Sequence, residues 1–157
     1  MRMQKALVVY DSYYGNTQAV AEAIAGALEG EVLLRKAGDL KGESMEGSYL
    51  FVVGSPTRAF RPSPDIAAFL RNLPGETIRK SDFLFFDTSY QTGEIQVAIL
   101  RFMAGIFGSA APAMSKDLRK RGGRVLGHRS FYVTGEKGPL APGEAERAAA
   151  WVRGLSL

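Results

Sequence analysis

The feature that most constrains the fold is an alternation of short apolar runs with amphipathic or polar stretches. The clearest runs are 6–10, 49–53 and 83–86, and shorter ones lie at 32–34 and 131–133. Continuous apolar runs of this length are typical of strands buried on both faces of a parallel sheet. Parallel neighbours need crossover connections, so helices are expected between the runs. The sequence therefore predicts a five-stranded parallel sheet covered by helices on both faces.

The stretches between the runs contain the expected helices. The first helix should end at Gly30 and bury one stripe formed by Val20, Ala21, Ile24, Ala25 and Leu28. Further helices are expected at 64–72, 114–121 and 143–154, and 37–48 is a polar connection with at most a short helix. No convincing repeat or linker divides the chain, so residues 1–157 are predicted to form a single domain.

Composition excludes several kinds of site. The 157 residues include no cysteine and a single histidine, His128, so disulfides, thiolate metal sites and polyhistidine metal sites are excluded. The opening apolar run is too short for a secretory signal, and no run is long enough to span a membrane. We therefore expect a cytoplasmic protein without a membrane span.

Polar residues follow three of the predicted strands, at 11–17, 54–61 and 87–93. In open parallel sheets, ligands bind at the carboxyl ends of the strands, near the point where the strand order reverses. These three segments are therefore expected to meet in one binding site.

The first of these segments has the strongest signal. Gly15-Asn16-Thr17 lies between a buried strand and a helix start, where unpaired N–H groups suit a phosphate. In the alternative interpretation, Ser12, Asn16 or Thr17 simply caps the helix. The segment lacks the lysine of a nucleoside-triphosphate loop, and no G-x-G-x-x-G occurs in the chain. A phosphate monoester held by amides and hydroxyls is the remaining expectation.

These residues resemble the opening signature of flavodoxins, which is satisfied by Val8-Val9-Tyr10, Ser12, Gly15 and Thr17. A second match is Gly54-Ser55-Pro56-Thr57, after the third strand. The resemblance implies a flavodoxin-like, doubly wound α/β fold with strand order 2-1-3-4-5. Receiver domains share this architecture, but they need a phosphoacceptor aspartate where this chain has Gly54 to Pro56.

The resemblance implies noncovalent FMN, with its phosphate on 12–17 and its ring between the second and third segments. Tyr90 and Phe60 are candidate aromatic neighbours of the ring. The implied cofactor-binding residues are Ser12, Tyr13, Tyr14, Gly15, Asn16, Thr17, Pro56, Thr57, Arg58, Ala59, Phe60, Thr88, Ser89, Tyr90 and Gly93. No catalytic acid, base or nucleophile and no metal ligand is predicted, because the redox chemistry belongs to the cofactor.

The charge of the chain departs from that of typical flavodoxins, which are acidic. Its sequence pI is about 9.5, and its second segment contains Arg58 and Arg61 against only Asp65. A cation near the ring stabilises fully reduced, anionic flavin, so we expect a less negative potential than in low-potential flavodoxins. A basic stretch at 116–129 is expected mostly at the end of the sheet opposite the flavin, as a solvated face.

Residues 95–107 are a second departure, because their apolar positions are more numerous than one sheet face requires. An ordinary core helix is one interpretation. A subunit contact, a substrate lid and a membrane-surface contact are the others.

Two functions remain open. One is electron transfer through FMN to a redox partner protein, and the other is an FMN-dependent oxidoreductase acting on a quinone, a porphyrinogen or NAD(P)H. A small-molecule acceptor is the corresponding partner of the second function. A nucleic-acid partner is not expected, because the basic stretch lacks interleaved aromatics.

Overall fold

A computed structural model gives the fold and describes residues 5–57, 61–90 and 110–157. Five strands form one parallel sheet in the order β2-β1-β3-β4-β5, which confirms the predicted sheet and strand order. The strands are β1 (Lys5–Tyr10), β2 (Val32–Lys36), β3 (Tyr49–Pro56), β4 (Asp82–Tyr90) and β5 (Arg124–Val133).

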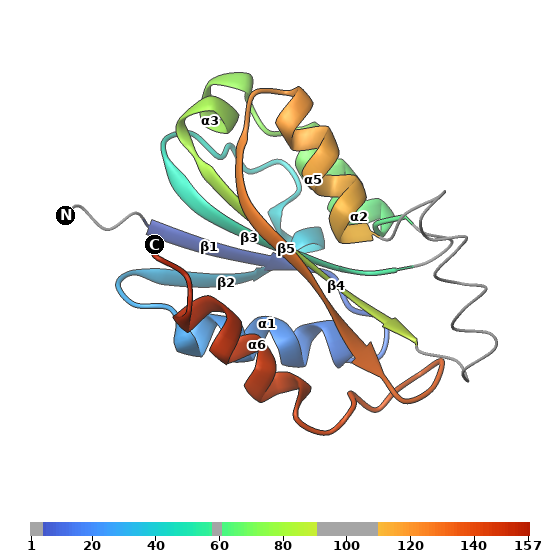
Figure 1. Ribbon diagram of the computed structural model, residues 1–157. Coiled ribbons are helices and arrows are strands. Elements are labelled where there is room, and N and C mark those ends of the chain that lie inside the picture. The colour runs from blue at the N-terminus through green and yellow to red at the C-terminus, as the bar shows by residue number, and fades with distance from the viewer. Residues whose placement is uncertain (1–4, 58–60, 91–109) are drawn as a thin grey trace.

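Helices cover both faces of the sheet, as predicted (Figure 1). They are α1 (Asn16–Ala27), a 3₁₀ turn η1 (Ala37–Leu40), α2 (Pro64–Arg71), α3 (Gly75–Lys80), α5 (Ala110–Lys120) and α6 (Glu144–Arg153). Helices α1 and α6 lie on one face, and α2, α3 and α5 lie on the other. The sequence pattern did not predict α3, because six residues are too few to show a helical period.

Alternate side chains of each central strand enter two separate cores. In β3, Phe51 and Val53 pack under α2, α3 and α5, whereas Leu50 and Val52 pack against α1 and α6. On the first of these faces the ring of Phe83 stacks on that of Phe51, with centroids 5.2 Å apart. Burial on both faces explains why these strands are continuous apolar runs rather than alternating ones.

Three predicted boundaries are wrong. Strands β3 and β4 were expected to break at Gly54 and Asp87, but their backbone pairing continues through Ser55↔Asp87 and Pro56↔Thr88. The polar residues remain in strand conformation because each has a paired neighbour. Helix α1 ends at Ala27 with Leu28 as its cap, so Gly30 is not the cap.

Gly54 illustrates why the end of β3 contains a glycine. It lies opposite Phe86 in the register of β3 and β4, and a Cβ at this position would overlap the Phe86 ring. Because glycine has no Cβ, the buried Phe86 ring can pack beside Gly54 on the side of the sheet that α1 covers.

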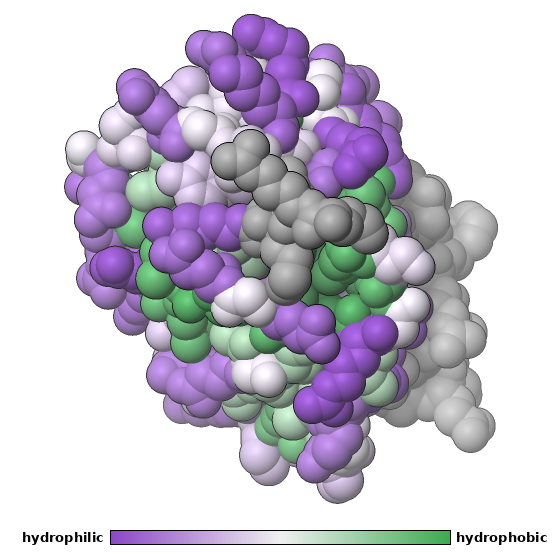
Figure 2. All heavy atoms as spheres, turned by 90° about the vertical axis from the view of Figure 1, so that its left-hand side faces the viewer, coloured by the Kyte–Doolittle hydropathy of each residue, from purple (hydrophilic) through white to green (hydrophobic). Residues whose placement is uncertain are grey.

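Figure 2 views the molecule from the amino ends of the strands, where hydrophilic side chains lie beside hydrophobic ones. The basic stretch lies largely at this end, because Lys116, Arg119 and Lys120 follow the middle of α5 and Arg124 begins β5. This agrees with the prediction that it lies away from the loops after the strands. Arg124 pairs with Asp82, with 2.6 Å between Nε and Oδ1. The hydrogen bond that Arg124 donates to Asp82 raises the pKa of the exposed Arg124 guanidinium.

Candidate functional site

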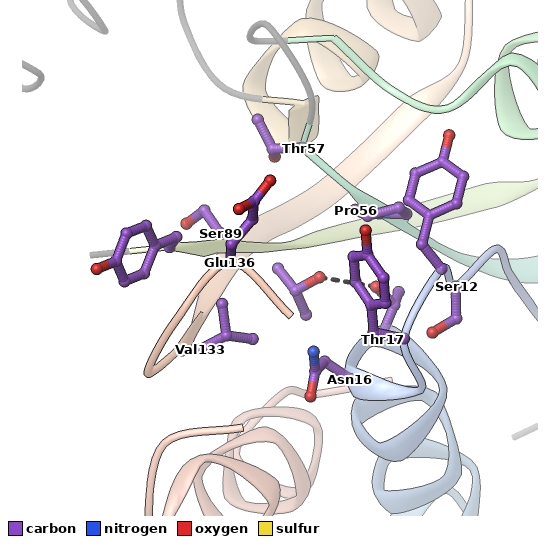
Figure 3. A pocket seen from close by; sticks show the side chains of 12 residues that line it. Ser12, Asn16, Thr17, Pro56, Thr57, Ser89, Val133 and Glu136 are labelled. Carbon is purple, nitrogen blue, oxygen red and sulfur yellow. Dashed lines mark hydrogen bonds between the residues drawn. The ribbon is translucent and has the colours of Figure 1, made fainter. Parts of the chain in front are cut away.

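A cavity of about 330 Å³ opens at the carboxyl ends of β1, β3, β4 and β5 (Figure 3). Its volume is in the range of small-molecule pockets, roughly 300–1,000 Å³. It is lined by Ser12, Tyr13, Tyr14, Asn16, Thr17, Pro56, Thr57, Thr88, Ser89, Tyr90, Val133 and Glu136. Residues from the three predicted segments, which lie at or after the ends of β1, β3 and β4, therefore meet at the carboxyl ends of the strands, as expected. Residues at and after the end of β5 also line the cavity, and these were not predicted.

The amino terminus of α1 forms one end of the cavity. Gly15 is the N-cap in the left-handed region at φ 90°, and no side chain caps the helix. Ser12 Oγ accepts a hydrogen bond from the Gly15 N–H at 2.9 Å, which fixes the turn before the helix. The capping interpretation of Ser12, Asn16 and Thr17 is therefore wrong. The first N–H groups of such a helix, together with its dipole, form a ready site for an anion.

The hydroxyl of Thr17 makes a tertiary contact instead of capping its helix. Thr17 Oγ1 and Thr88 Oγ1 lie 2.7 Å apart in a buried hydrogen bond, drawn as the dashed line in Figure 3. Both residues line the cavity. The bond links the start of α1 to the end of β4 and so fixes the position of the helix relative to the sheet.

The opposite end of the cavity is formed by Pro56 and Thr57 at the end of β3. The Thr57 N–H donates to the Thr88 carbonyl at 3.0 Å, so its backbone is held by β4. Its side-chain Oγ1 is buried and has no hydrogen-bond partner in the described part of the chain. An unsatisfied buried hydroxyl costs about 1–3 kcal/mol, so a ligand that pairs with it is favoured.

Aromatic side chains surround the cavity while remaining exposed. Tyr13, Tyr14 and Tyr90 have 43%, 46% and 47% of their surface exposed, and all three line it. Aromatic rings gathered at a concave site favour a flat, apolar ligand. Tyr90 lines this cavity, and its contact with a flavin ring stays a prediction.

Two buried carboxylates near the cavity accept hydrogen bonds from the backbone of the segments that follow the strands. Asp87 Oδ2 accepts a hydrogen bond from the Ala111 N–H at the start of α5, at 2.8 Å. Asp11 Oδ1 accepts one from the Ser12 N–H at 2.9 Å. Neither residue lines the cavity, so both are assigned to loop positioning rather than to chemistry.

One predicted site residue does not line the cavity, and four others stay untested. Gly15 supplies the cap of α1 without lining the cavity. Arg58, Ala59, Phe60 and Gly93 are outside the described residues, as is the segment 95–107.

Sequence reasoning missed Val133 and Glu136, which line the cavity from the end of β5 and the turn after it. The signal that could have found them was the strand-end rule itself. It was applied to the strands that precede the recognised motifs and not to the fifth strand.

An ion pair at the start of α6 supports the end of β5. Glu144 Oε2 accepts hydrogen bonds from the Tyr132 N–H at 2.8 Å and from Arg147 at 2.7 Å. The hydrogen bond from Arg147, assisted by that from Tyr132, lowers the pKa of the Glu144 carboxyl. Arg147 also donates to the Ser130 carbonyl at 2.6 Å. The Tyr132 N–H and the Ser130 carbonyl, on the outer edge of β5, therefore both have hydrogen-bond partners.

Known structures share this architecture. An archaeal flavodoxin superimposes with a TM-score of 0.66 at 20% identity, over 95% of this chain and 94% of that one. A Fusobacterium nucleatum flavodoxin mutant bound to flavin mononucleotide gives 0.61 at 15%, over 96% and 94%. Rubredoxin oxygen:oxidoreductase from Desulfovibrio gigas gives 0.64 at 18%, over 93% of this chain and 33% of that one. No family model matches the sequence, and no curated protein matches it.

Strand order, layers and structural neighbours together define a flavodoxin-like fold, as the sequence motifs predicted. Within the described ranges, no cluster of three or more acidic, histidine or cysteine side chains is placed to hold a metal ion. None of the helices described is both long and apolar enough to cross a membrane.

Proposed function

We propose that the chain binds FMN noncovalently in this cavity and transfers electrons through it. The observation that carries the proposal is the amino terminus of α1, which opens on the cavity without a side-chain cap. A phosphate dianion at such a terminus receives hydrogen bonds from backbone amides and favourable interaction with the helix dipole. A structural neighbour with the same fold binds flavin mononucleotide, which supports the choice of ligand.

The residues present fit this cofactor. The phosphate is assigned to the segment from Ser12 to Thr17, and the ring to the end lined by Pro56, Thr57 and Tyr90. The unpartnered Thr57 hydroxyl supplies a polar group at the ring end. Thr88 and Ser89 also line the cavity. Arg58, Ala59, Phe60 and Gly93 remain proposed contacts from the sequence.

Bound FMN supplies one- and two-electron redox chemistry, whereas the chain supplies binding, orientation and charge. The tyrosines at the mouth exclude water from the apolar part of the ligand. The helix terminus fixes the opposite end, so that the ligand is held at both ends.

A redox partner protein is the first proposed acceptor, and the cytoplasm is the proposed location. An FMN-dependent oxidoreductase acting on a quinone, a porphyrinogen or NAD(P)H is the second candidate. It is favoured by the basic composition, with a sequence pI of about 9.5, which differs from that of acidic electron shuttles.

A flavin titration tests the binding proposal. FMN and riboflavin are titrated into the protein, and quenching of flavin fluorescence is followed. We expect FMN to bind at least tenfold more tightly than riboflavin, because only FMN places a phosphate at α1. Equal affinities would exclude the phosphate assignment. NAD(P)H oxidation by the loaded protein, with and without quinone, then separates the enzyme from the electron carrier.

A further inference from the structure

A second hollow lies between α2 and α5, on the face of the sheet opposite α1 and α6 (Figure 1). It is an open groove of about 520 Å³, formed by the two helices and the residue pair before α2. We propose that this groove binds an acidic amphipathic helix of a partner protein. The proposal concerns a protein–protein contact and stands whether or not the strand-end cavity binds flavin.

The groove has an apolar floor. Leu70 of α2 and Met114 of α5 line it, and both belong to the buried core on this face of the sheet. Ala67 and Ala113 line it nearer the surface, since Ala67 is half-buried and Ala113 is exposed. Alanines on both sides leave room for the side chains of an added helix. This arrangement is typical of grooves that receive the apolar face of an amphipathic helix.

The charges at the groove are mainly positive. Arg71 lines it from α2 and Arg121 from α5. Arg121 lies 3.4 Å from Asp117, the single carboxylate among the described lining residues. Arg71 pairs with no carboxylate in the described part of the chain, and the same holds for the exposed Lys120, one position before Arg121. Complementary potentials therefore select a partner with carboxylates beside its apolar stripe.

The charge of the whole chain acts in the same direction. The net charge is +4 at pH 7, which attracts an acidic partner at long range and repels a second copy of the chain. An acidic helix is therefore favoured over self-association as the occupant of the groove.

One end of the groove adjoins the end of β3. Pro62 lines the groove, and the next residue, Ser63, donates its N–H to Ser55 Oγ at 2.8 Å. Pro56 and Thr57, which follow Ser55, line the strand-end cavity. A helix bound in the groove therefore has one end beside that cavity, where a partner could exchange electrons with a bound cofactor.

Fluorescence anisotropy with a labelled model peptide tests the proposal on the full-length protein, both without flavin and after addition of FMN. The probe is an amphipathic helix of about 15 residues, with leucines along one face and glutamates elsewhere. One control peptide has lysine in place of glutamate, and the other has the same composition with the leucine stripe scrambled. We expect the glutamate peptide to bind at least about tenfold more tightly than either control.

Two variants with matched controls locate the binding surface. Ala113→Leu fills the groove from an exposed position without changing the charge, and it should weaken the glutamate peptide by about tenfold. Arg71→Glu should weaken the glutamate peptide by a similar factor and strengthen the lysine peptide. The controls are Ala150→Leu and Arg153→Glu, at exposed positions of α6 on the other face of the sheet, and neither should change the affinity.

Failure of this proposal is distinct from failure of flavin binding, because the peptide is also measured without flavin. Absence of binding, or equal binding of the glutamate peptide and either control peptide, would overturn the docking surface. Binding that Ala113→Leu leaves unaltered would overturn it too, since the peptide would then lie elsewhere. A wild-type dimer in sedimentation that Ala113→Leu dissociates would show that a second copy occupies the groove, and would exclude the acidic partner.

Discussion

The two ends of the cavity differ in how their polar side chains are satisfied. At the α1 end, Ser12, Asn16 and Thr17 each make a hydrogen bond within the protein, to Gly15, Lys137 and Thr88. At the β3 end, the buried hydroxyl of Thr57 has no partner in the described part of the chain.

This difference teaches which part of the site the protein organises by itself. The paired side chains at the α1 end hold the backbone in place, so its amides are ready for an anion without rearrangement. The Thr57 end retains an unmet hydrogen bond that a ligand can supply. We therefore expect substitutions at the first end to disturb both the fold and phosphate binding. Substitutions at the second end should act on ligand binding alone.

The largest effect is expected at the α1 end, from Thr17→Val. The substitution keeps the side-chain volume but removes the hydroxyl bonded to Thr88, which can donate to a phosphate when Thr88 is the donor in that bond. We expect FMN binding to weaken by about 1–3 kcal/mol, with a smaller loss for riboflavin. Isothermal titration gives both values. Thr17→Ser, which restores the hydroxyl, is the control, and an equal loss for the two flavins would contradict the phosphate assignment.

Next in size is the pH-dependent stability contributed by Glu144, which supports the β5 side of the cavity. Its pKa is held below the ordinary 4.5, mainly by the hydrogen bond from Arg147. A lowered folded-state pKa stabilises the fold above pH 4.5, and this contribution is lost as the pH falls through the folded-state value. We expect Glu144→Gln to cost about 1–2 kcal/mol at pH 7, after allowance for the partial exposure of Arg147. The difference from wild type should shrink toward pH 3.

Urea unfolding of both proteins across this pH range provides the measurement. Glu76→Gln is the comparison, because the Glu76–Lys80 pair is exposed and lies on α3, away from the cavity. The hydrogen bond that Lys80 donates to Glu76 also lowers the pKa of Glu76, yet solvent screens the pair, so stability should hardly change. A Glu144 difference that stayed constant down to pH 3 would exclude the ion pair as its cause.

Thr57→Val tests whether the β3 end of the cavity acts on ligand binding rather than on stability. Replacing an unsatisfied buried hydroxyl by a methyl group removes a desolvation cost, so the flavin-free protein should be equally or slightly more stable. Flavin affinity should fall by about 1 kcal/mol, because the ligand loses the hydroxyl. Melting curves with and without FMN measure both effects. Destabilisation of the flavin-free protein would show that the two ends do not differ.

The smallest effect concerns charge around the ring. Glu136→Gln removes a carboxylate from the cavity and should make the potential of fully reduced flavin less negative, by about 20–40 mV at low salt. Arg58→Glu removes the cation that the sequence predicts near the ring and should shift the potential in the opposite direction. Both shifts should diminish in 1 M salt as screening increases. Potentiometric titration of both variants measures the two shifts in potential. Shifts of the same sign would contradict a charge effect.

Much of the fold could be predicted from sequence because its signals are local. Runs such as 49–53 can be buried on both faces only in a covered parallel sheet, and crossover rules then leave few strand orders. The motif from Ser12 to Thr17 marked the start of α1 correctly, since a strand–turn–helix places a glycine where φ is positive. The short helix α3 was beyond this reasoning because six residues show no period.

By itself, then, the sequence determined the sheet, its covering helices and three polar segments at its carboxyl edge, two of which carry motifs. Only the tertiary structure decided the partners of the polar side chains: Thr17 bonds to Thr88 and not to its own helix, and Asn16 reaches the turn at Lys137. It also brought Glu136 into the cavity. The physical reason is that strand and helix formation depend on neighbours along the chain. Hydrogen bonds between loops depend on where the packed sheet places residues more than seventy positions apart.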